Sequence, residues 1–265
     1  MPFVESNGVR LRYRLEGKPG APVILFSNSL GTDLSMWDPQ VSALRNEYGI
    51  LRYDTRGHGL SSVSGGAFTQ EDLGRDVLAV LDAAGVSRAY FCGISMGGQT
   101  GIWLGANASE RFERLMLCNT AAHIGTPESW NSRIAAIRTG GMGAVASAAI
   151  ERWFTKRFID GNPTTIASIR QMILDTPPAG YISCCEAIRD ADLIMQAPKM
   201  DVPVTVISGA YDPATTPAQG RVLSCMIPDS RYVELDAAHI SNIEAAGEFT
   251  STLRECFTRA AQTAV

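Results

Sequence analysis

Residues 89–107 read AYFCGISMGGQTGIWLGAN: a strand-like apolar run, a serine framed by glycines, and a helix-like run. The centre of this segment, Gly93-Ile94-Ser95-Met96-Gly97, matches the pattern G-x-S-x-G. Glycines two positions before and after the serine permit a tight, strained turn that larger side chains would obstruct. The pattern alone is weak evidence, because an ordinary glycine-rich turn is the alternative. Its strand–turn–helix setting predicts that Ser95 is a nucleophile at such a turn.

The alternation of strand and helix continues on both sides of this segment. Apolar runs predict strands at 22–28, 48–54, 88–92, 114–119, 202–209 and 231–236. Helices are predicted at 38–47, 69–84 with Thr69 as N-cap, 96–107 and 244–261. Residues 3–5 and 9–15 flank an Asn7-Gly8 turn and predict an opening hairpin. The sequence therefore predicts an α/β fold: a mostly parallel eight-stranded sheet with an N-terminal antiparallel hairpin, flanked by helices.

One segment, residues 124–195, breaks this alternation. It contains no strand pattern, and helical patterns dominate it, at 130–139, 142–154, 163–176 and 180–191. We therefore expect an inserted helical cap at 124–195, between two parts of one core, 1–123 and 196–265. A cap at this point of the chain would cover the carboxyl edge of the sheet, where Ser95 is expected.

The composition excludes several classes of protein. The 265 residues include 23 Lys and Arg against 27 Asp and Glu, so the formal net charge is −4 and the pI is about 5.5. A protein that binds nucleic acid through bulk positive charge is not expected at this pI. The sequence has no 18-residue apolar run and no signal-peptide pattern at its start, so we expect no membrane partner and a cytoplasmic location.

The cysteines give no metal or disulfide pattern. There are six, and none forms a C-x-x-C pair of the kind that binds zinc. A disulfide framework is not expected in a chain without an export signal. We therefore predict no metal site.

A serine hydroxyl needs a histidine base to attack at neutral pH, and the chain has three histidines. The strand–serine–helix motif resembles that of the α/β hydrolases, in which the order along the chain is serine, acid, histidine. Only His239 follows a strand-end acid that itself follows Ser95, so His239 is the predicted base. His58 is expected to make structural hydrogen bonds in its loop. His123 lies at the carboxyl end of a strand, where ligands bind in open α/β sheets, and is a candidate for substrate contact.

Two carboxylates compete for the third position of a catalytic triad. Asp212 follows the strand 202–209 and can hold the imidazole of His239 in the required tautomer. Asp236 lies only three residues before His239, at the end of a strand, and cannot easily reach around the ring. We therefore predict Asp212 as the acid.

Attack on a carbonyl also needs two N–H groups that stabilise the oxyanion. One is expected from the backbone of Met96, the residue after the nucleophile. The other is expected from Leu30, in the loop after strand 22–28. Many α/β hydrolases carry His-Gly in this loop, whereas this chain has Asn28-Ser29, a departure that argues against a generic esterase.

A set of longer motifs resembles one family closely. The motifs are SNSLGTDLSMWD (27–38), LRYDTRGHG (51–59), GISMGG (93–98), LCNTAA (117–122), SWNSRI (129–134), RDAD (189–192) and AAHISN (237–242). Together they resemble the 3-oxoadipate enol-lactonases of bacterial aromatic-compound degradation, which have the α/β-hydrolase fold. The resemblance spans nearly the whole chain, including the insertion. It implies a carboxylic ester hydrolase of the β-ketoadipate pathway that works through an acyl-enzyme and needs no cofactor.

The expected cap is basic in its first half. Residues 129–158 hold five Arg and Lys against the single acid Glu151. The family's substrate is a lactone with a free carboxylate, which needs a cationic or hydrogen-bonding partner. Arg133, inside the SWNSRI motif, is the first candidate, with Trp130 and Trp153 as an apolar wall. The alternative is that these arginines are solvated and the tryptophans are cap core.

We therefore expect a serine hydrolase whose partner is a small carboxylated lactone and whose state is monomeric or weakly homo-oligomeric. Another carboxylesterase, a carbon–carbon bond hydrolase and a perhydrolase share the same triad and remain alternatives. A non-enzymatic small-molecule receptor on the same scaffold is a more remote one.

Overall fold

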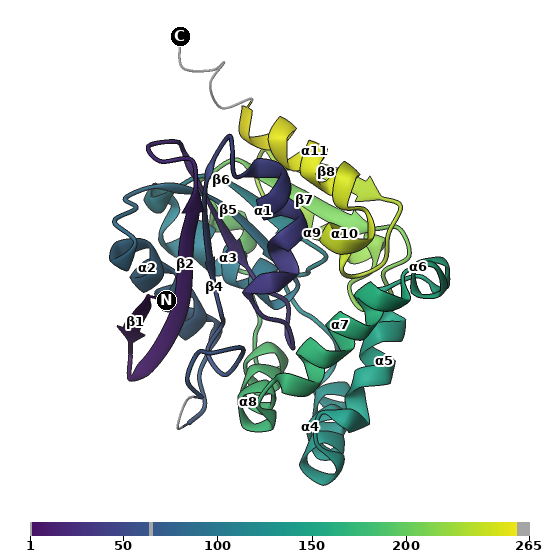
Figure 1. Cartoon of the computed structure of the whole chain (residues 1–265). Helices are drawn as coiled ribbons and strands as arrows, with labels where there is room; N and C mark the ends of the chain where they lie inside the picture. Colours follow the sequence, from purple (N-terminus) through teal and green to yellow (C-terminus); the bar gives the residue numbers. More distant parts are fainter. Residues whose placement is uncertain (1, 64–65, 259–265) are drawn as a thin grey trace.

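An eight-stranded sheet forms the centre of the protein in the computed structural model, which describes residues 2–63 and 66–258 (Figure 1). The strands are β1 (Phe3–Ser6), β2 (Val9–Gly17), β3 (Val23–Ser27), β4 (Gly49–Tyr53), β5 (Ala89–Ile94), β6 (Phe112–Cys118), β7 (Val204–Gly209) and β8 (Arg231–Leu235). They lie in the order β1-β2-β4-β3-β5-β6-β7-β8. β2 pairs antiparallel with β1 and β4, and the later pairs are parallel, with Phe26 of β3 opposite Cys92 of β5. The predicted fold class is confirmed.

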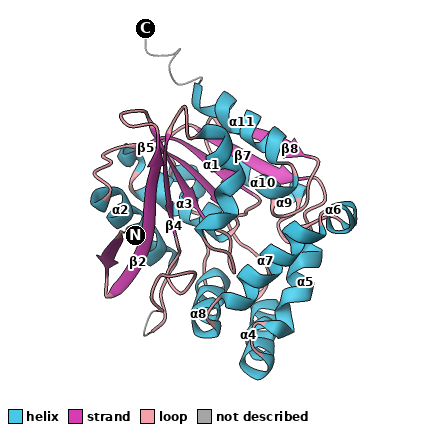
Figure 2. Cartoon of the chain, viewed as in Figure 1, coloured by secondary structure: helices cyan, strands magenta, loops and turns pink. Residues whose placement is uncertain are grey.

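Helices cover both faces of this sheet (Figure 2). On one face lie α2 (Gln70–Ala83), α3 (Met96–Asn107) and α9 (Pro217–Met226), and on the other lie α1 (Asp38–Leu44) and α11 (Ala246–Thr258). Alternate strand residues serve the two faces: in β3, Leu25 packs toward α2 and α3, whereas Ile24 and Phe26 pack toward α1 and α11. All three side chains are fully buried, which explains why the central strands read as continuous apolar runs.

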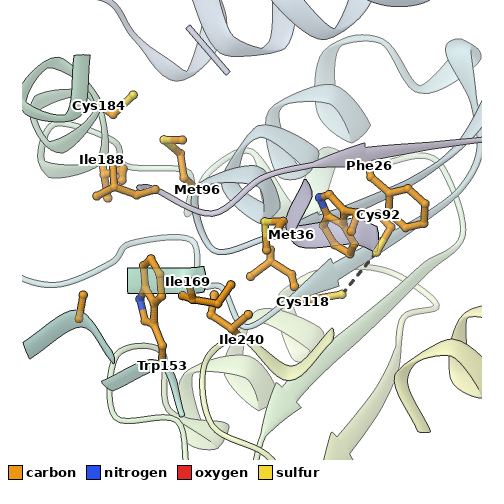
Figure 3. Close-up of a cluster of buried hydrophobic side chains, with 14 of the residues drawn as sticks. Phe26, Met36, Cys92, Met96, Cys118, Trp153, Ile169, Cys184, Ile188 and Ile240 are labelled. Atoms are coloured by element: carbon orange, nitrogen blue, oxygen red, sulfur yellow. Dashed lines mark hydrogen bonds between the residues drawn. The ribbon is translucent and has the colours of Figure 1, made fainter. Parts of the chain in front are cut away.

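Five helices lie between β6 and β7, and we call them the cap. They are α4 (Pro127–Gly140), α5 (Gly143–Trp153), α6 (Lys156–Gly161), α7 (Pro163–Asp175) and α8 (Pro178–Arg189). In Figure 1 they form a group below the sheet. Their apolar faces join the same buried cluster as the sheet: Figure 3 shows Trp153, Ile169 and Ile188 of the cap in one cluster with Phe26 and Cys92.

The structure differs from the sequence prediction in a few elements. The predicted closing helix, 244–261, is α11, which begins at Ala246, and the last three predicted residues lie outside the described part. The sequence patterns predict no helix at α6, at α9 or at the short α10 (Ser241–Glu244). The described residues also contain three short 3-10 turns, at Leu34–Trp37, Ser109–Arg111 and Ala197–Lys199. Helix α9 was missed because only Gly220 and Leu223 of its residues are buried, too few for an apolar stripe.

The six cysteines are thiols, and all but Cys225 are buried. Cys92 and Cys118 share a weak hydrogen bond, with their sulfur atoms 3.9 Å apart (Figure 3). Burial is the main cause that raises the pKa of the Cys92 thiol, and the hydrogen bond with Cys118 raises it further, so this thiol remains protonated. In residues 2–63 and 66–258 no helix is long and apolar enough to cross a membrane.

Candidate active site

Ser95 occupies a strained turn between β5 and α3. Its backbone angles are φ +58° and ψ −113°, in the left-handed half of conformational space that a serine rarely adopts. The flanking glycines are sterically required. A Cβ on Gly93 would lie 2.3 Å from the carbonyl oxygen of Gly97, and one on Gly97 would lie 2.4 Å from that of Ser27. The turn therefore has the geometry of a nucleophile elbow, with the N-terminus of α3 beginning at the next residue.

His239 and Asp212 meet at the carboxyl ends of β8 and β7. Asp212 Oδ2 accepts a hydrogen bond from His239 Nδ1 at 2.8 Å. Both side chains are almost fully buried, and the hydrogen bond fixes the ring so that Nδ1 carries the proton and Nε2 has the free lone pair. Among residues 2–63 and 66–258, no hydrogen bond joins Ser95 Oγ to His239, although both residues line the same cavity.

Asp212 is held as a carboxylate by many donors. Burial alone would raise its pKa, but His239, Thr215 and Asn119 together bring the pKa below its ordinary value. Thr215 donates both its backbone N–H, at 3.0 Å, and its hydroxyl, at 2.8 Å. The backbone N–H of Ala214 donates at 2.8 Å and the Asn119 amide at 3.1 Å. The competitor Asp236 is half exposed and forms an ion pair with Arg157 at 2.9 Å. Asp212 therefore contacts His239 as the prediction required, and Asp236 does not.

Asn119 is a buried residue that the sequence analysis did not select. Its backbone has a positive φ of 46°, and its side chain bridges two loops. Its amide donates to Asp212 Oδ2 and to the Ala238 carbonyl, both at 3.1 Å, and its oxygen accepts the Ser241 hydroxyl at 2.6 Å. Asn119 therefore joins the loop that carries the acid to the loop that carries the base. The LCNTAA motif contains it, but nothing in that motif indicates this contact.

The two predicted oxyanion donors lie beside Ser95. Leu30 lines the cavity, and Met96 is the first residue of α3, whose N–H has no partner within the helix. In the described part of the chain, neither N–H group has a hydrogen-bond partner, so both are free to bind an oxyanion. The Leu30 loop is tied to the turn of Ser95, because Gly97 N donates to the Asn28 carbonyl at 3.1 Å.

Asn28 occupies the place where many α/β hydrolases carry histidine, and it anchors this loop. Its side-chain amide donates to the Tyr53 carbonyl at 2.8 Å, and its oxygen accepts from the Trp37 indole at 3.0 Å. All three side chains are buried. The Asn28 side chain therefore anchors the loop without a charge, through hydrogen bonds of both its amide nitrogen and its amide oxygen.

A cavity of about 210 Å³ opens above Ser95 and His239. This is below the usual range for drug-sized ligands, so it suits a small molecule. Residues of the core and of the cap line it together: Ser29, Leu30, Ser95, Ile124, Gly125, Ser129, Trp130, Arg133, Ala149, Arg152, Trp153, Tyr181, Pro213, Ala214 and His239. The predicted Trp130, Arg133 and Trp153 all lie at this cavity.

Two arginines, Arg133 and Arg152, face this cavity without a carboxylate partner in the described residues. The guanidinium of Arg133 lies over the Trp130 ring, 4.5 Å from its centroid. Burial is the main cause that lowers the pKa of Arg152, and the nearby positive charge of Arg133 lowers it further. The other basic residues of the predicted basic stretch are paired outside the cavity: Arg138 with Glu186, Lys156 with Asp160, and Arg157 with Asp236. Arg152 belongs to the predicted basic stretch, but the sequence alone does not distinguish it from its other basic residues.

His123 lies elsewhere. It borders a separate apolar hollow formed with α9, and its Nδ1 bonds the Ala191 carbonyl at 3.0 Å. The strand β6 ends near the catalytic residues, but the chain turns away over the next four residues and directs His123 to a different surface. The structure therefore gives no support for the predicted contact between His123 and substrate.

Comparison with known proteins places the chain in a family. Residues 22–246 match the family model of the alpha/beta hydrolase fold. Two 3-oxoadipate enol-lactonases of Acinetobacter baylyi are 41% and 40% identical to it, over 96% and 93% of this chain and 95% and 92% of theirs. The crystal structure of the enol-lactonase from Burkholderia xenovorans LB400 matches with a TM-score of 0.95 and 52% identity, over 97% of this chain and 100% of that one. The chain belongs to the 3-oxoadipate enol-lactonase family of α/β hydrolases.

Proposed function

We propose that this protein opens 3-oxoadipate enol-lactone with water to give 3-oxoadipate, a step of the β-ketoadipate pathway, by serine catalysis. The observation that carries the proposal is one small cavity lined both by Ser95 and His239 and by two arginines that have no carboxylate partner among the described residues. The first pair supplies acyl-transfer chemistry, and the second supplies a site for a substrate carboxylate. The near full-length relatives named 3-oxoadipate enol-lactonase support the same substrate.

The first half of the reaction forms an acyl-enzyme. His239 Nε2 takes the proton of the Ser95 hydroxyl as Ser95 Oγ attacks the lactone carbonyl. The Leu30 and Met96 N–H groups stabilise the oxyanion of the tetrahedral intermediate. Asp212, held as a carboxylate, stabilises the imidazolium that forms on His239.

Collapse of the intermediate breaks the ring C–O bond. The leaving group is an enolate or enol, which remains tethered to the acyl chain and becomes a ketone. Because an enolate is a much better leaving group than an alkoxide, the ring C–O bond breaks without full proton transfer from His239. The proton that His239 took from Ser95 then passes to the enolate, which becomes the ketone, and His239 is neutral again for the second half of the reaction. Water then attacks the acyl-enzyme with His239 as general base, and 3-oxoadipate leaves Ser95.

Arg133 and Arg152 provide the electrostatic selection of the substrate. Both are partly buried at the cavity wall, and the described residues offer neither of them an ion pair. A substrate carboxylate would supply the missing negative charge through charge-assisted hydrogen bonds. Trp130 holds the Arg133 guanidinium against its ring, which restricts the orientations that this arginine can take.

The experiment that tests this function compares a carboxylated with an uncharged substrate. Arg133→Met and Arg152→Met should each lower kcat/KM for the enol-lactone by about 10- to 100-fold, the loss expected for a hydrogen bond to a charged group. Hydrolysis of p-nitrophenyl acetate should change little. Arg138→Met is the matched control, because Arg138 is a cap arginine paired with Glu186 at 3.6 Å and lies outside the cavity.

Two outcomes contradict the proposal. Wild-type protein that hydrolyses neutral esters but leaves the enol-lactone intact would be a different carboxylesterase. Equal losses on both substrates in the arginine variants would mean that these residues hold the cap and not the carboxylate. The cytoplasmic location, the oligomeric state and the division of the chain into core and cap domains stay predictions.

A further inference from the structure

His58 is a buried histidine that the proposed reaction does not use. It lies in the loop after β4, has no exposed surface, and touches the loop that carries Leu30. Its Nε2 lies 2.9 Å from the backbone nitrogen of Gly31, which must be the donor of this hydrogen bond. Nδ1 then carries the ring proton and donates to the Arg56 carbonyl at 3.2 Å. The two contacts together require a neutral ring of one defined tautomer.

The residue that His58 holds comes directly after the proposed oxyanion donor. Gly31 has a positive φ of 81°, so the chain turns sharply at this point. The N–H of Gly31 belongs to the peptide group that joins it to Leu30. Fixing that peptide group restricts rotation about the Leu30 backbone, and with it the direction of the Leu30 N–H.

The cap closes over the same contact. A Cβ on Gly31 would lie 2.9 Å from the Tyr181 ring, and one on Gly57 would lie 2.5 Å from Gly180 of α8. Cys184 Sγ approaches His58 Nδ1 at 3.9 Å. These close approaches leave His58 fully buried, and they exclude water that could replace its hydrogen bond to Gly31.

We propose that His58 is a positioning residue for catalysis, which orients the Leu30 N–H toward the oxyanion by accepting the hydrogen bond of the Gly31 N–H. The side chain does not reach the reacting atoms, and it acts through the Leu30–Gly31 peptide group. The proposal rests on the proposed function in one respect, the assignment of Leu30 as an oxyanion donor. Burial, the main influence on this ring, lowers the pKa of His58 to about 4, which agrees with a neutral acceptor at physiological pH.

Two variants of His58 separate positioning from simple packing. His58→Gln keeps an oxygen that can accept from Gly31 N–H, whereas His58→Leu fills similar space without an acceptor. Removing an oxyanion donor outright costs about 10²- to 10³-fold in kcat, so misdirecting one should cost about 10- to 100-fold. We expect that loss in kcat for His58→Leu, with KM nearly unchanged, and a much smaller loss for His58→Gln.

A second readout follows the oxyanion itself. A trifluoromethyl ketone that carries a carboxylate forms a tetrahedral adduct with the serine and places its oxygen in the same site. Its inhibition constant should rise in His58→Leu by the same factor as kcat/KM falls. Inhibition by the product 3-oxoadipate, which forms no tetrahedral adduct with Ser95, should change much less.

Several results would overturn the proposal. These are a folded His58→Leu variant with wild-type kcat, equal losses in the leucine and glutamine variants, and parallel losses of adduct and product affinity. Should the leucine variant not fold, His58→Met repeats the comparison with a more adaptable apolar side chain. Should the wild-type protein hydrolyse p-nitrophenyl esters but not the lactone, the proposed function fails, while the His58 comparison still runs on the ester.

Discussion

Lowering the pH from 7 to 5 should destabilise this fold through His58. In the folded protein, burial lowers the pKa of His58 to about 4, whereas the ordinary value is 6.5. Between these two values, the unfolded chain binds a proton that the folded chain does not bind. The contribution of His58 to stability is therefore fully present above about pH 6.5 and is lost as the pH falls toward 4.

The magnitude follows from the size of this shift. A difference of about 2.5 pKa units corresponds to about 3 kcal/mol over the whole window, of which about 2 kcal/mol is lost between pH 7 and pH 5. The charged and titratable groups near the ring are Asp33, Arg56, Tyr181 and Cys184. The hydrogen bond to the Arg56 carbonyl, and after it the charge of Asp33, favour the protonated ring, but burial outweighs both.

Urea unfolding at pH 7 and pH 5, followed by circular dichroism, measures this loss. His58→Gln is the control, because it removes the titration while keeping an acceptor for Gly31. Buried acids such as Asp54 and Asp76, whose pKa values burial raises, contribute with the opposite sign, but they are common to both proteins. The free energy of unfolding should fall by about 2 kcal/mol more in the wild type than in the variant. Equal pH dependence in the two proteins would refute a neutral, buried His58.

The remaining predictions concern the proposed catalytic acid Asp212, Asn119, which holds its loop, and the buried ion pair of Arg56 with Asp76. Asp212→Asn should lower kcat by about 10⁴-fold, because His239 would adopt the wrong tautomer. Asp236→Asn should leave kcat close to the wild-type value. Equal losses of kcat in the two variants would contradict the assignment of Asp212 as the acid. Asn119→Ala should lower kcat more than it raises KM, since it loosens the Asp212 loop, and a pure stability loss in thermal unfolding would contradict that role. Asp76→Ala should cost about 3–5 kcal/mol in urea unfolding, because it leaves the buried Arg56 guanidinium unpaired, and a cost below about 1 kcal/mol would contradict this reasoning.

Local sequence patterns predicted the core of the fold well. A strand that is buried on both faces of a sheet needs apolar residues at consecutive positions, and such runs are visible in the sequence. The turn at Ser95 could be predicted for a related reason. A side chain at Gly93 would clash with Gly97, four residues away, and one at Gly97 would clash with Ser27 of the neighbouring strand. Both requirements appear in the sequence as glycines within one short motif. The pairing of Asp212 with His239 was predicted from the order of triad residues in the α/β hydrolases, the place of Asp212 after a strand, and the short separation of Asp236 from His239.

Contacts between segments that are distant in the sequence could not be predicted from local sequence patterns. Unlike Arg138 and Arg157, Arg152 lines the cavity and forms no ion pair in the described residues, and both are properties of the folded chain. The bridge made by Asn119 and the hydrogen bond from Gly31 to His58 join loops from different strands. His123 illustrates the opposite error, since its position after a strand suggested the site, but the following turn directs it away.

Initial rates of 3-oxoadipate enol-lactone hydrolysis by the wild-type protein and by Ser95→Ala test the central claim most directly. The loss of the ultraviolet absorbance of the enol ester follows the reaction, and mass spectrometry identifies 3-oxoadipate as the product. The account predicts rapid turnover by the wild type and a fall of at least about 10⁴-fold in Ser95→Ala. Near-wild-type turnover by Ser95→Ala, or no turnover by the wild type, would contradict it.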